Sequence, residues 1–402
     1  QAVFESGWRD MPPGERTRLL RNLAKRIHEN VETLAQLETR NVGKPIGDAR
    51  WEADAGAKVF DYYAGAIGHL CGQTIPVARG GFDFTLRQPM GVIAAITPWN
   101  FPFLIACWKV APALAAGNSV VLKPASLTPL TALMLGQLAQ EAGLPDGVLQ
   151  VLPGSGAEAG NALATHPLVR KIGFTGSTEV GATIMKLAAD DIKRVSLELG
   201  GKSPNIVFAD ANWERAAAES PMSVFANTGQ DCCARSRMFI EQSIFDGFVD
   251  QFVAATESLK IGDPTDEATQ VGPMVSAAQR ELSESYITGA RDAGREIRTG
   301  GDRPSGGGFY LNPAVVTGVE TGDRAWSEEI FGPVVCLRPF TDETEMLREV
   351  NDTNFGLSGS VWSNDLSRAL RVARQVESGV ISINSHSSVH TEAPFGGFKR
   401  SG

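Results

Sequence analysis

The stretch at residues 91–123, GVIAAITPWNFPFLIACWKVAPALAAGNSVVLK, decides the fold. Its two ends, residues 91–97 and 119–123, are short apolar runs rich in β-branched side chains, as in strands buried on both faces. Residues 102–116 between them begin with proline and are long enough for a helix. Since parallel strands need such a crossover connection, the stretch predicts a strand–helix–strand unit of a parallel sheet.

The same alternation extends along most of the chain. Further strands are expected in the first half at 148–152, 171–175 and 195–199, with helices between them. A second series follows, with strands at 205–208, 238–241, 313–319, 333–340, 358–363 and 379–384 and helices at 213–225, 243–259, 276–293, 342–350 and 365–375. We therefore predict an α/β protein with two Rossmann-like parallel-sheet lobes, joined near Gly200 and Gly201.

The N-terminal region differs from this rhythm. Apolar residues at helical spacing predict helices at 14–38 and at 47–68. At residues 73–87 the apolar period changes to two on either side of Gly80–Gly81, which predicts a β-hairpin. Such a hairpin is either an arm that pairs with another chain or an ordinary surface hairpin.

Composition excludes several classes of partner. Of the 402 residues, 43% are hydrophobic and 21% charged, which is ordinary for a soluble globular protein. The net charge of −9 argues against nucleic acid or an anionic membrane as a partner. No apolar run is long enough to span a bilayer. Because the chain starts at Gln1 and stops within a glycine-rich segment at Gly402, we expect a fragment of a longer protein.

The five cysteines do not form a disulfide framework, and no Cys-x-x-Cys or histidine cluster suggests a metal site. A reducing, cytoplasmic setting is expected. Two of the cysteines stand in the turn-forming stretch at residues 227–233, NTGQDCC. A thiol in an exposed polar turn can act as a nucleophile. The alternative is a buried structural thiol.

Seven motifs, in one order over essentially the whole chain, resemble the NAD(P)-dependent aldehyde dehydrogenase superfamily in its hydrolytic, non-acylating form. They are TPWNFP at 97–102, KPA at 123–125, FTGSTEVG at 174–181, LELGGKSP at 197–204, GQDC at 229–232, EIFGP at 329–333 and PFGG at 394–397. The resemblance implies oxidation of a small-molecule aldehyde to a carboxylic acid, with NAD or NADP as cofactor.

The resemblance also implies three residues for the chemistry. Cys232 is the expected nucleophile, since the motif places the cysteine second after Gly-Gln, which excludes Cys233. Asn100 is the expected oxyanion donor, together with the backbone N–H of Cys232; a turn-forming role fits Asn100 equally on sequence alone. Glu198 is the expected base for hydrolysis of the thioester, with a pKa raised by burial; the alternative is a salt-bridged strand end.

A larger set of residues is implied for the cofactor. Ser177 is expected at the pyrophosphate, where a strand feeds a helix N-terminus. Ser126 stands where many NAD-preferring members carry glutamate, so we expect NADP to be tolerated. Lys123 is alternatively a solvated strand end, and Glu329 and Phe331 a helix-end acid and a core aromatic. The implied set is Ile96, Thr97, Pro98, Trp99, Lys123, Ala125, Ser126, Gly156, Gly160, Phe174, Thr175, Gly176, Ser177, Val180, Leu199, Gly200, Glu329 and Phe331.

Substrate contacts are less defined by the sequence. Phe101, Trp108 and Phe395 are expected to wall the substrate channel, although core packing accounts for them as well. Asp231 beside the nucleophile could favour an amino-bearing aldehyde, but aspartate is also a common turn residue. His386, His390 and Glu392 lie in the segment that lines the entrance in the family, where the histidines are alternatively solvated loop positions.

The expected domains follow from these assignments. Residues 1–70 and 88–200, with part of 386–402, form a cofactor-binding domain, 71–87 an oligomerisation hairpin, and 201–385 a catalytic domain. A homodimer or homotetramer is expected. Two alternatives stay open: a CoA-acylating semialdehyde dehydrogenase, which is expected to lack the base at Glu198, and a non-catalytic cofactor-binding protein, which is expected to lack Cys232 or Asn100.

Overall fold

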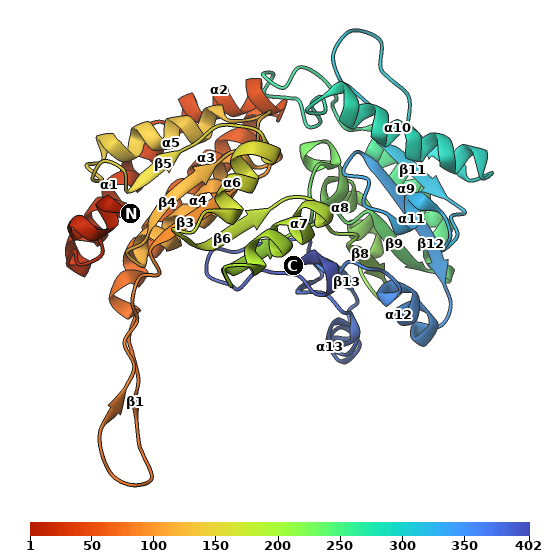
Figure 1. Cartoon of the computed structure of the whole chain (residues 1–402). Coiled ribbons are helices and arrows are strands. Elements are labelled where there is room, and N and C mark those ends of the chain that lie inside the picture. The colour runs from red at the N-terminus through yellow and green to blue at the C-terminus, as the bar shows by residue number, and fades with distance from the viewer. The chain divides into compact units, whose positions relative to one another are not determined.

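The computed structural model describes residues 1–402 and divides them into two compact units (Figure 1). The first unit comprises residues 1–41 and 49–196, and the second comprises residues 42–48 and 197–402. The α/β class and the parallel sheets predicted from the sequence are confirmed. The functional division into cofactor-binding and catalytic domains stays a prediction. These units differ from it because they assign residues 42–48, 197–200 and all of 386–402 to the second unit and residues 71–87 to the first.

The first unit is built on a five-stranded sheet in the order β5-β4-β3-β6-β7. β3 pairs in parallel with both β4 and β6, and all five of its residues are buried. This explains the continuous apolar run that predicted it. The strands are β3 (Val92–Ile96), β4 (Ser119–Lys123), β5 (Leu149–Val151), β6 (Val169–Thr175) and β7 (Arg194–Glu198).

Helices accompany this sheet. They are α1 (Pro13–Glu29), α2 (Val31–Val42), α3 (Ile46–Ala66), α4 (Pro102–Ala115), α5 (Leu130–Glu141), α6 (Asn161–Thr165) and α7 (Thr178–Ala189). Of these, α1 to α5 share one core with β3, β4 and β5, while α6 contacts β6 and α7. The prediction of a single helix at 14–38 was wrong, because α1 and α2 are two separate helices. Asn30, with φ −113° and ψ 15°, ends α1, and its side chain donates to the Arg26 carbonyl at 2.8 Å. Asparagine competes for backbone hydrogen bonds in this way and favours helix ends.

The second unit contains a seven-stranded sheet in the order β10-β11-β12-β9-β8-β13-β14. Its strands are β8 (Pro204–Val207), β9 (Arg237–Glu241), β10 (Glu296–Thr299), β11 (Ala314–Thr317), β12 (Val334–Phe340), β13 (Ser358–Trp362) and β14 (Val380–Ile383). All neighbours are parallel except β10, which pairs antiparallel with β11 at the edge. The sequence did not predict β10, whose residues are mostly charged or polar.

Helices flank this sheet and include one predicted to the residue, α8 (Trp213–Phe225). The others are α9 (Phe245–Glu257), α10 (Ala277–Asp292), α11 (Arg324–Ser327), α12 (Glu343–Asn351) and α13 (Leu366–Gln375). The sequence missed α11, which is a single turn too short to show a helical period. No helix of the protein combines the length and apolar composition that a bilayer crossing requires.

The predicted hairpin is present and extends as a long arm (Figure 1). Only β1 (Thr74–Ile75) and β2 (Asp83–Phe84) pair, in antiparallel register, and Gly80 and Gly81 adopt positive φ in the turn. The arm exposes large apolar side chains, most of all Phe82 at 79% of its surface. A two-stranded ribbon with so little pairing gains little stability by itself.

Substitution by alanine is expected to have opposite effects on stability at two glycines of α3. A Cβ at Gly56 would lie 2.5 Å from the Phe103 ring and 3.0 Å from Cys107 Sγ in α4, whereas a Cβ at Gly65 would meet nothing within 4 Å. We expect Gly65→Ala to stabilise the protein by about 0.5–1 kcal/mol through helix propensity. Gly56→Ala should destabilise it by about 1–3 kcal/mol because the packed interface must open. Thermal unfolding of both variants measures this; a higher Tm for Gly56→Ala would contradict the packing of α3 on α4.

Candidate active site

The nucleophile candidate stands in a sharply bent turn between α8 and β9. Asn227, Thr228 and Gly229 adopt positive φ of 50°, 59° and 72° in succession. Left-handed backbone is costly for a β-branched residue such as Thr228 and must be maintained by its surroundings. At Gly229 a Cβ would lie 2.2 Å from the Gly332 carbonyl oxygen, so only glycine fits. The turn is therefore strained and packed directly against another backbone segment.

Side-chain hydrogen bonds maintain the bend. Gln230 accepts at Oε1 from the Val275 N–H at 2.9 Å and donates from Nε2 to the Asn227 carbonyl at 3.0 Å. Thr228 donates from Oγ1 to the Gly272 carbonyl at 3.0 Å. All these side chains are buried. Buried polar groups with satisfied partners fix a single conformation, so the turn holds the residues that follow it in a defined direction.

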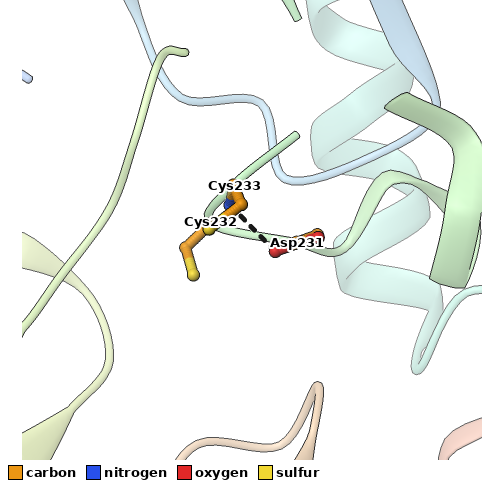
Figure 2. Close-up of side chains that lie close together, drawn as sticks. All are labelled: Asp231, Cys232 and Cys233. Carbon is orange, nitrogen blue, oxygen red and sulfur yellow. Dashed lines mark hydrogen bonds between the residues drawn. The ribbon is translucent and has the colours of Figure 1, made fainter. Parts of the chain in front are cut away.

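Asp231, Cys232 and Cys233 close the turn (Figure 2). The Asp231 carboxylate accepts the Cys233 N–H at 2.8 Å, and the Cys232 side chain projects away from the loop (Figure 2). One carboxylate oxygen and the two sulfurs all lie within 4.8 Å of one another. Asp231 thus has the turn-forming role that the sequence left open, while its predicted role toward substrate stays a prediction.

The surroundings keep the Cys232 thiol protonated. Its pKa is raised well above the ordinary value, first by a hydrogen bond with the neighbouring Cys233 thiol and then by burial. The negative charges of Asp231 and Glu329 add to the effect. Burial also raises the pKa of Asp231 itself. The predicted role of Cys232 as a nucleophile at neutral pH therefore requires that its proton be removed as the reaction starts.

The end of β7 and the motif at residue 329 converge on this turn in the second unit. Glu329 accepts the Gly201 N–H at Oε1 at 2.9 Å. A Cβ at Gly200 would lie 2.1 Å from Glu329 Oε2, and one at Gly201 would lie 2.1 Å from the Cys232 carbonyl oxygen. The Gly200–Gly201 pair therefore lets Glu329 and the Cys232 backbone approach the strand end that carries Glu198.

The C-terminal segment completes this group of residues. Gly396 packs close to Glu198, since a Cβ on it would lie 3.5 Å from Oε1. Phe395 beside it is half-buried. Ser401 accepts the Leu199 N–H at its carbonyl at 2.8 Å and donates from Oγ to the Gly200 carbonyl at 2.7 Å. Ser401 was not predicted from the sequence as part of the site, although it anchors the glycine pair.

In the first unit the predicted residues gather where the strands end. Residues 97–101 follow β3, and the Thr97 N–H donates to the Lys123 carbonyl at 3.1 Å. Asn100 is buried, with 3% of its surface exposed. The alternative of a solvated Lys123 was wrong, because its ammonium is buried against the Pro124 carbonyl at 2.9 Å and burial lowers its pKa. Trp108 packs on the core of this unit from α4.

The same edge of this sheet offers donors suited to a dinucleotide. Ser177 caps α7, and its Oγ accepts the Val180 N–H at 3.3 Å. The N-terminus of a helix favours phosphate oxygens through its free N–H groups and its dipole. Ser126, three residues after β4, donates to the Gly154 carbonyl after β5 at 3.0 Å and so links two of the turns expected to bind the cofactor. These residues fit NAD or NADP.

The comparisons with known proteins decide the family. A model of the aldehyde dehydrogenase family matches residues 1–402. The chain belongs to this family. A putative aldehyde dehydrogenase DhaS of Bacillus subtilis is 43% identical over 402 residues, covering 100% of this chain and 81% of that protein. The peroxisomal aminoaldehyde dehydrogenase 2 of Pisum sativum is 44% identical, covering 98% of this chain and 80% of that protein.

Solved structures agree with this assignment. An NAD-dependent aldehyde dehydrogenase from Sinorhizobium meliloti superposes with a TM-score of 0.97 at 41% identity, covering 99% of this chain and 80% of that one. A betaine aldehyde dehydrogenase from Staphylococcus aureus in complex with NAD+ gives 0.97 at 38% identity, covering 100% and 80%. This aldehyde dehydrogenase is thus an NAD- or NADP-dependent enzyme that oxidises aldehydes. The two alternatives, a CoA-acylating enzyme and a non-catalytic binding protein, are not favoured.

Of the two histidines that could be solvated loop positions, only one is exposed. His390 and Glu392 are exposed, but His386 packs against Trp362, with ring centroids 5.1 Å apart. Its Nε2 lies 3.2 Å from Ser220 Oγ. Burial and then the charges of Arg235 and Arg215 lower the pKa of His386 to about 3, so it is neutral at physiological pH. No sequence pattern predicted this packing, because Ser220 and Arg235 lie more than 100 residues from His386 in the chain.

Removal of the Cys233 thiol is expected to change the reactivity of the Cys232 thiol. We expect Cys233→Ala to lower the pKa of Cys232, because the hydrogen bond that raises it most is lost. A lower pKa increases the thiolate fraction at every pH below it, so alkylation by iodoacetamide should begin at lower pH. Mass spectrometry of the Cys232 peptide across a pH series measures the rate. Cys71→Ala, at an exposed cysteine of the first unit, is the control; a profile shared by all three proteins would contradict the assignment.

Proposed function

We propose that this enzyme oxidises its aldehyde through a thioester on Cys232, with Glu198 as the general base and Asn100 as an oxyanion donor. The observation that carries the proposal is the convergence of three segments in the second unit. The strand end with Glu198, the Glu329 segment and the Cys232 turn meet where the Gly200–Gly201 pair removes side-chain bulk.

The first half of the reaction forms a bond between Cys232 Sγ and the carbonyl carbon of the aldehyde. The thiol proton passes to a water molecule as the bond forms, because the raised pKa of Cys232 keeps the thiol protonated beforehand. The aldehyde oxygen becomes an oxyanion, which the Asn100 amide and the Cys232 N–H stabilise. One such donor is worth about 3–4 kcal/mol in comparable sites. NAD or NADP, when bound, supplies the acceptor for the hydride that leaves the thiohemiacetal carbon.

The second half of the reaction is hydrolysis of the thioester. Glu198 accepts a proton from a water molecule, the hydroxide adds to the acyl carbon, and the C–S bond breaks to give a carboxylic acid and the Cys232 thiol. The half-buried position of Glu198 at the end of β7 supports this role, since partial desolvation favours a carboxylate as proton acceptor.

For the cofactor we propose that Lys123 binds the adenosine ribose, Ser177 the pyrophosphate and Glu329 the nicotinamide ribose. The buried Lys123 ammonium and the capped start of α7 support the first two assignments. Ser126 is exposed and uncharged, so nothing at this position repels a 2′-phosphate. We therefore propose that the enzyme accepts NADP as well as NAD.

We propose an aldehyde that bears an amino or quaternary ammonium group. Asp231 and Glu329 both raise the pKa of Cys232, which is the effect of a negative potential at the nucleophile. A negative potential attracts a cationic substrate and raises its local concentration. The names of the pea and Staphylococcus aureus relatives support the same class of substrate.

An absorbance assay for NADH and NADPH tests the mechanism. Cys232→Ala should reduce kcat by more than about 1,000-fold, because a nucleophile is lost outright. Glu198→Gln should still release about one equivalent of reduced cofactor per subunit and then stall, because acylation proceeds and hydrolysis does not. Wild-type enzyme and Cys71→Ala are the controls. A panel of neutral, amino- and trimethylammonium aldehydes ranks substrates, and turnover in Cys232→Ala would exclude the proposed mechanism.

We also propose that the hairpin arm joins subunits into a homodimer or homotetramer. Its exposed Phe82, Phe84 and Leu86 support this, since an isolated two-stranded ribbon rarely displays such a row without a partner. A double substitution, Phe82→Asp with Leu86→Asp, should lower the mass measured by light scattering. Leu366→Asp, at an equally exposed leucine of α13, should not. An unchanged mass in the double variant would exclude the arm as the contact.

We further propose a cytoplasmic location. All five cysteines are free thiols, which supports a reducing compartment.

A further inference from the structure

A buried arginine lies directly behind the nucleophile turn. Arg235, between the turn and β9, exposes only 1% of its surface. Burial lowers the pKa of its guanidinium, but the side chain keeps five hydrogen-bond donors in a rigid fork. Enclosing such a cation in the protein is costly unless its donors are used. An arginine here therefore requires specific partners.

Those partners lie on three separate segments and are all neutral oxygens. Nη1 donates to the Cys233 carbonyl in the turn, and Nε donates to Ser360 Oγ of β13 at 2.9 Å. Nη2 donates to the Gly359 carbonyl at 3.3 Å, to the His386 carbonyl at 3.4 Å and to Ser388 Oγ. One side chain thus joins the nucleophile turn, the sheet and the segment 386–388.

The arginine and Asp231 hold Cys233 from opposite ends. The Cys233 N–H donates to the Asp231 carboxylate at 2.8 Å, and its carbonyl accepts from Arg235. Fixing both backbone groups of a residue fixes its φ and ψ. Because Cys232 precedes it directly, the direction of the Cys232 side chain depends on this clamp.

The far end of the clamp is equally well anchored. Ser388 Oγ, the acceptor of Nη2, also accepts from Ser358 Oγ at 2.9 Å. The ring of His386 lies with Nδ1 3.4 Å from Ser360 Oγ. The segment 386–388 leads to Phe395, which we assigned to the substrate wall. A displacement of this segment would therefore be transmitted through Arg235 to the turn.

We propose that Arg235 is a positioning residue that aligns Cys232 by clamping the Cys233 carbonyl to the segment 386–388. The inference rests on the proposed role of Cys232 as nucleophile. Arg235 touches neither substrate nor cofactor and acts only through the backbone of the turn. Because a misplacement of about 1 Å can cost about 100-fold in rate, the clamp should act on the rate of bond formation more than on binding.

Two neighbouring residues, Arg237 and Ser387, help to distinguish the positioning role of Arg235 from simple core packing. Arg237, two residues later, is also buried, but it donates to the Lys202 carbonyl at 3.1 Å and the Val350 carbonyl at 3.0 Å, away from the turn. Ser387 is adjacent to Ser388, but its Oγ lies 3.2 Å from His390 Nε2 and does not contact Arg235. Ser387→Ala is therefore a matched control for Ser388→Ala.

The test measures the burst rate of NADH formation, which reports acylation of Cys232, together with KM and Tm. We expect Arg235→Met to slow the burst about 10–100-fold with little change in the KM for NAD. Arg235→Lys should not restore the rate, because one ammonium cannot span the same acceptors. Ser388→Ala should slow the burst several-fold at nearly unchanged Tm, whereas Ser387→Ala should not.

A double-mutant cycle decides whether the clamp acts as one unit. Ser388→Ala should add nothing to Arg235→Met, because the link that it removes is already gone. A wild-type burst rate in folded Arg235→Met, or independent additive effects, would overturn the proposal. If Arg235→Met does not fold, a wild-type burst rate in Ser388→Ala overturns it equally. Full activity in Cys232→Ala would overturn the proposed function itself. An inactive Cys232→Ala together with a wild-type burst rate in Arg235→Met would overturn only the proposed role of Arg235.

Discussion

The close approach of backbone to backbone at Gly201 is the constraint on which the second unit's site depends. A Cβ there would lie 2.1 Å from the Cys232 carbonyl oxygen, and its N–H is held by Glu329. At Gly229 the turn meets the Gly332 carbonyl with similar closeness. Two backbone segments can approach each other this closely only where no Cβ lies between them. The Cys232 turn, the strand end with Glu198 and Glu329 therefore owe their proximity to missing Cβ atoms as much as to attractive contacts.

The electrostatics of the site follow from the same packing. Burial, the neighbouring Cys233 thiol and the charges of Asp231 and Glu329 all raise the pKa of Cys232. A thiol held in its neutral form is protected from alkylation and oxidation until a reaction begins. The protection makes a base necessary, and the same charges create the negative potential on which the proposed preference for a cationic substrate rests. Reactivity and selectivity are thus two results of one arrangement of charges.

Buried cations behind the site are held by neutral oxygens. Arg235 binds carbonyls and hydroxyls, Arg237 binds two carbonyls, and Lys202 donates to the Ala325 carbonyl at 2.8 Å. Burial lowers the pKa of Lys202 to about 8 and that of Arg237 to about 10. Carbonyl oxygens fixed in loops and strand ends offer less attraction than carboxylates, but they tie the cation to the backbone. Buried cations can therefore set backbone geometry around a turn that local sequence alone would leave flexible.

The sequence by itself determined the α/β class and most strand and helix bounds, and its motifs predicted Cys232 as the nucleophile. These features depend on local periods and on short motifs, which are complete within a few residues; α8 was predicted to the residue for this reason. Tertiary structure alone decided the helix break at Asn30, the antiparallel edge strand β10, the packing of His386 on Trp362 and the burial of Lys123. It also decided the partners of Arg235, which are more than 100 residues away except for Cys233. Burial and pairing at such separations are set by packing, and no local pattern of residues encodes them.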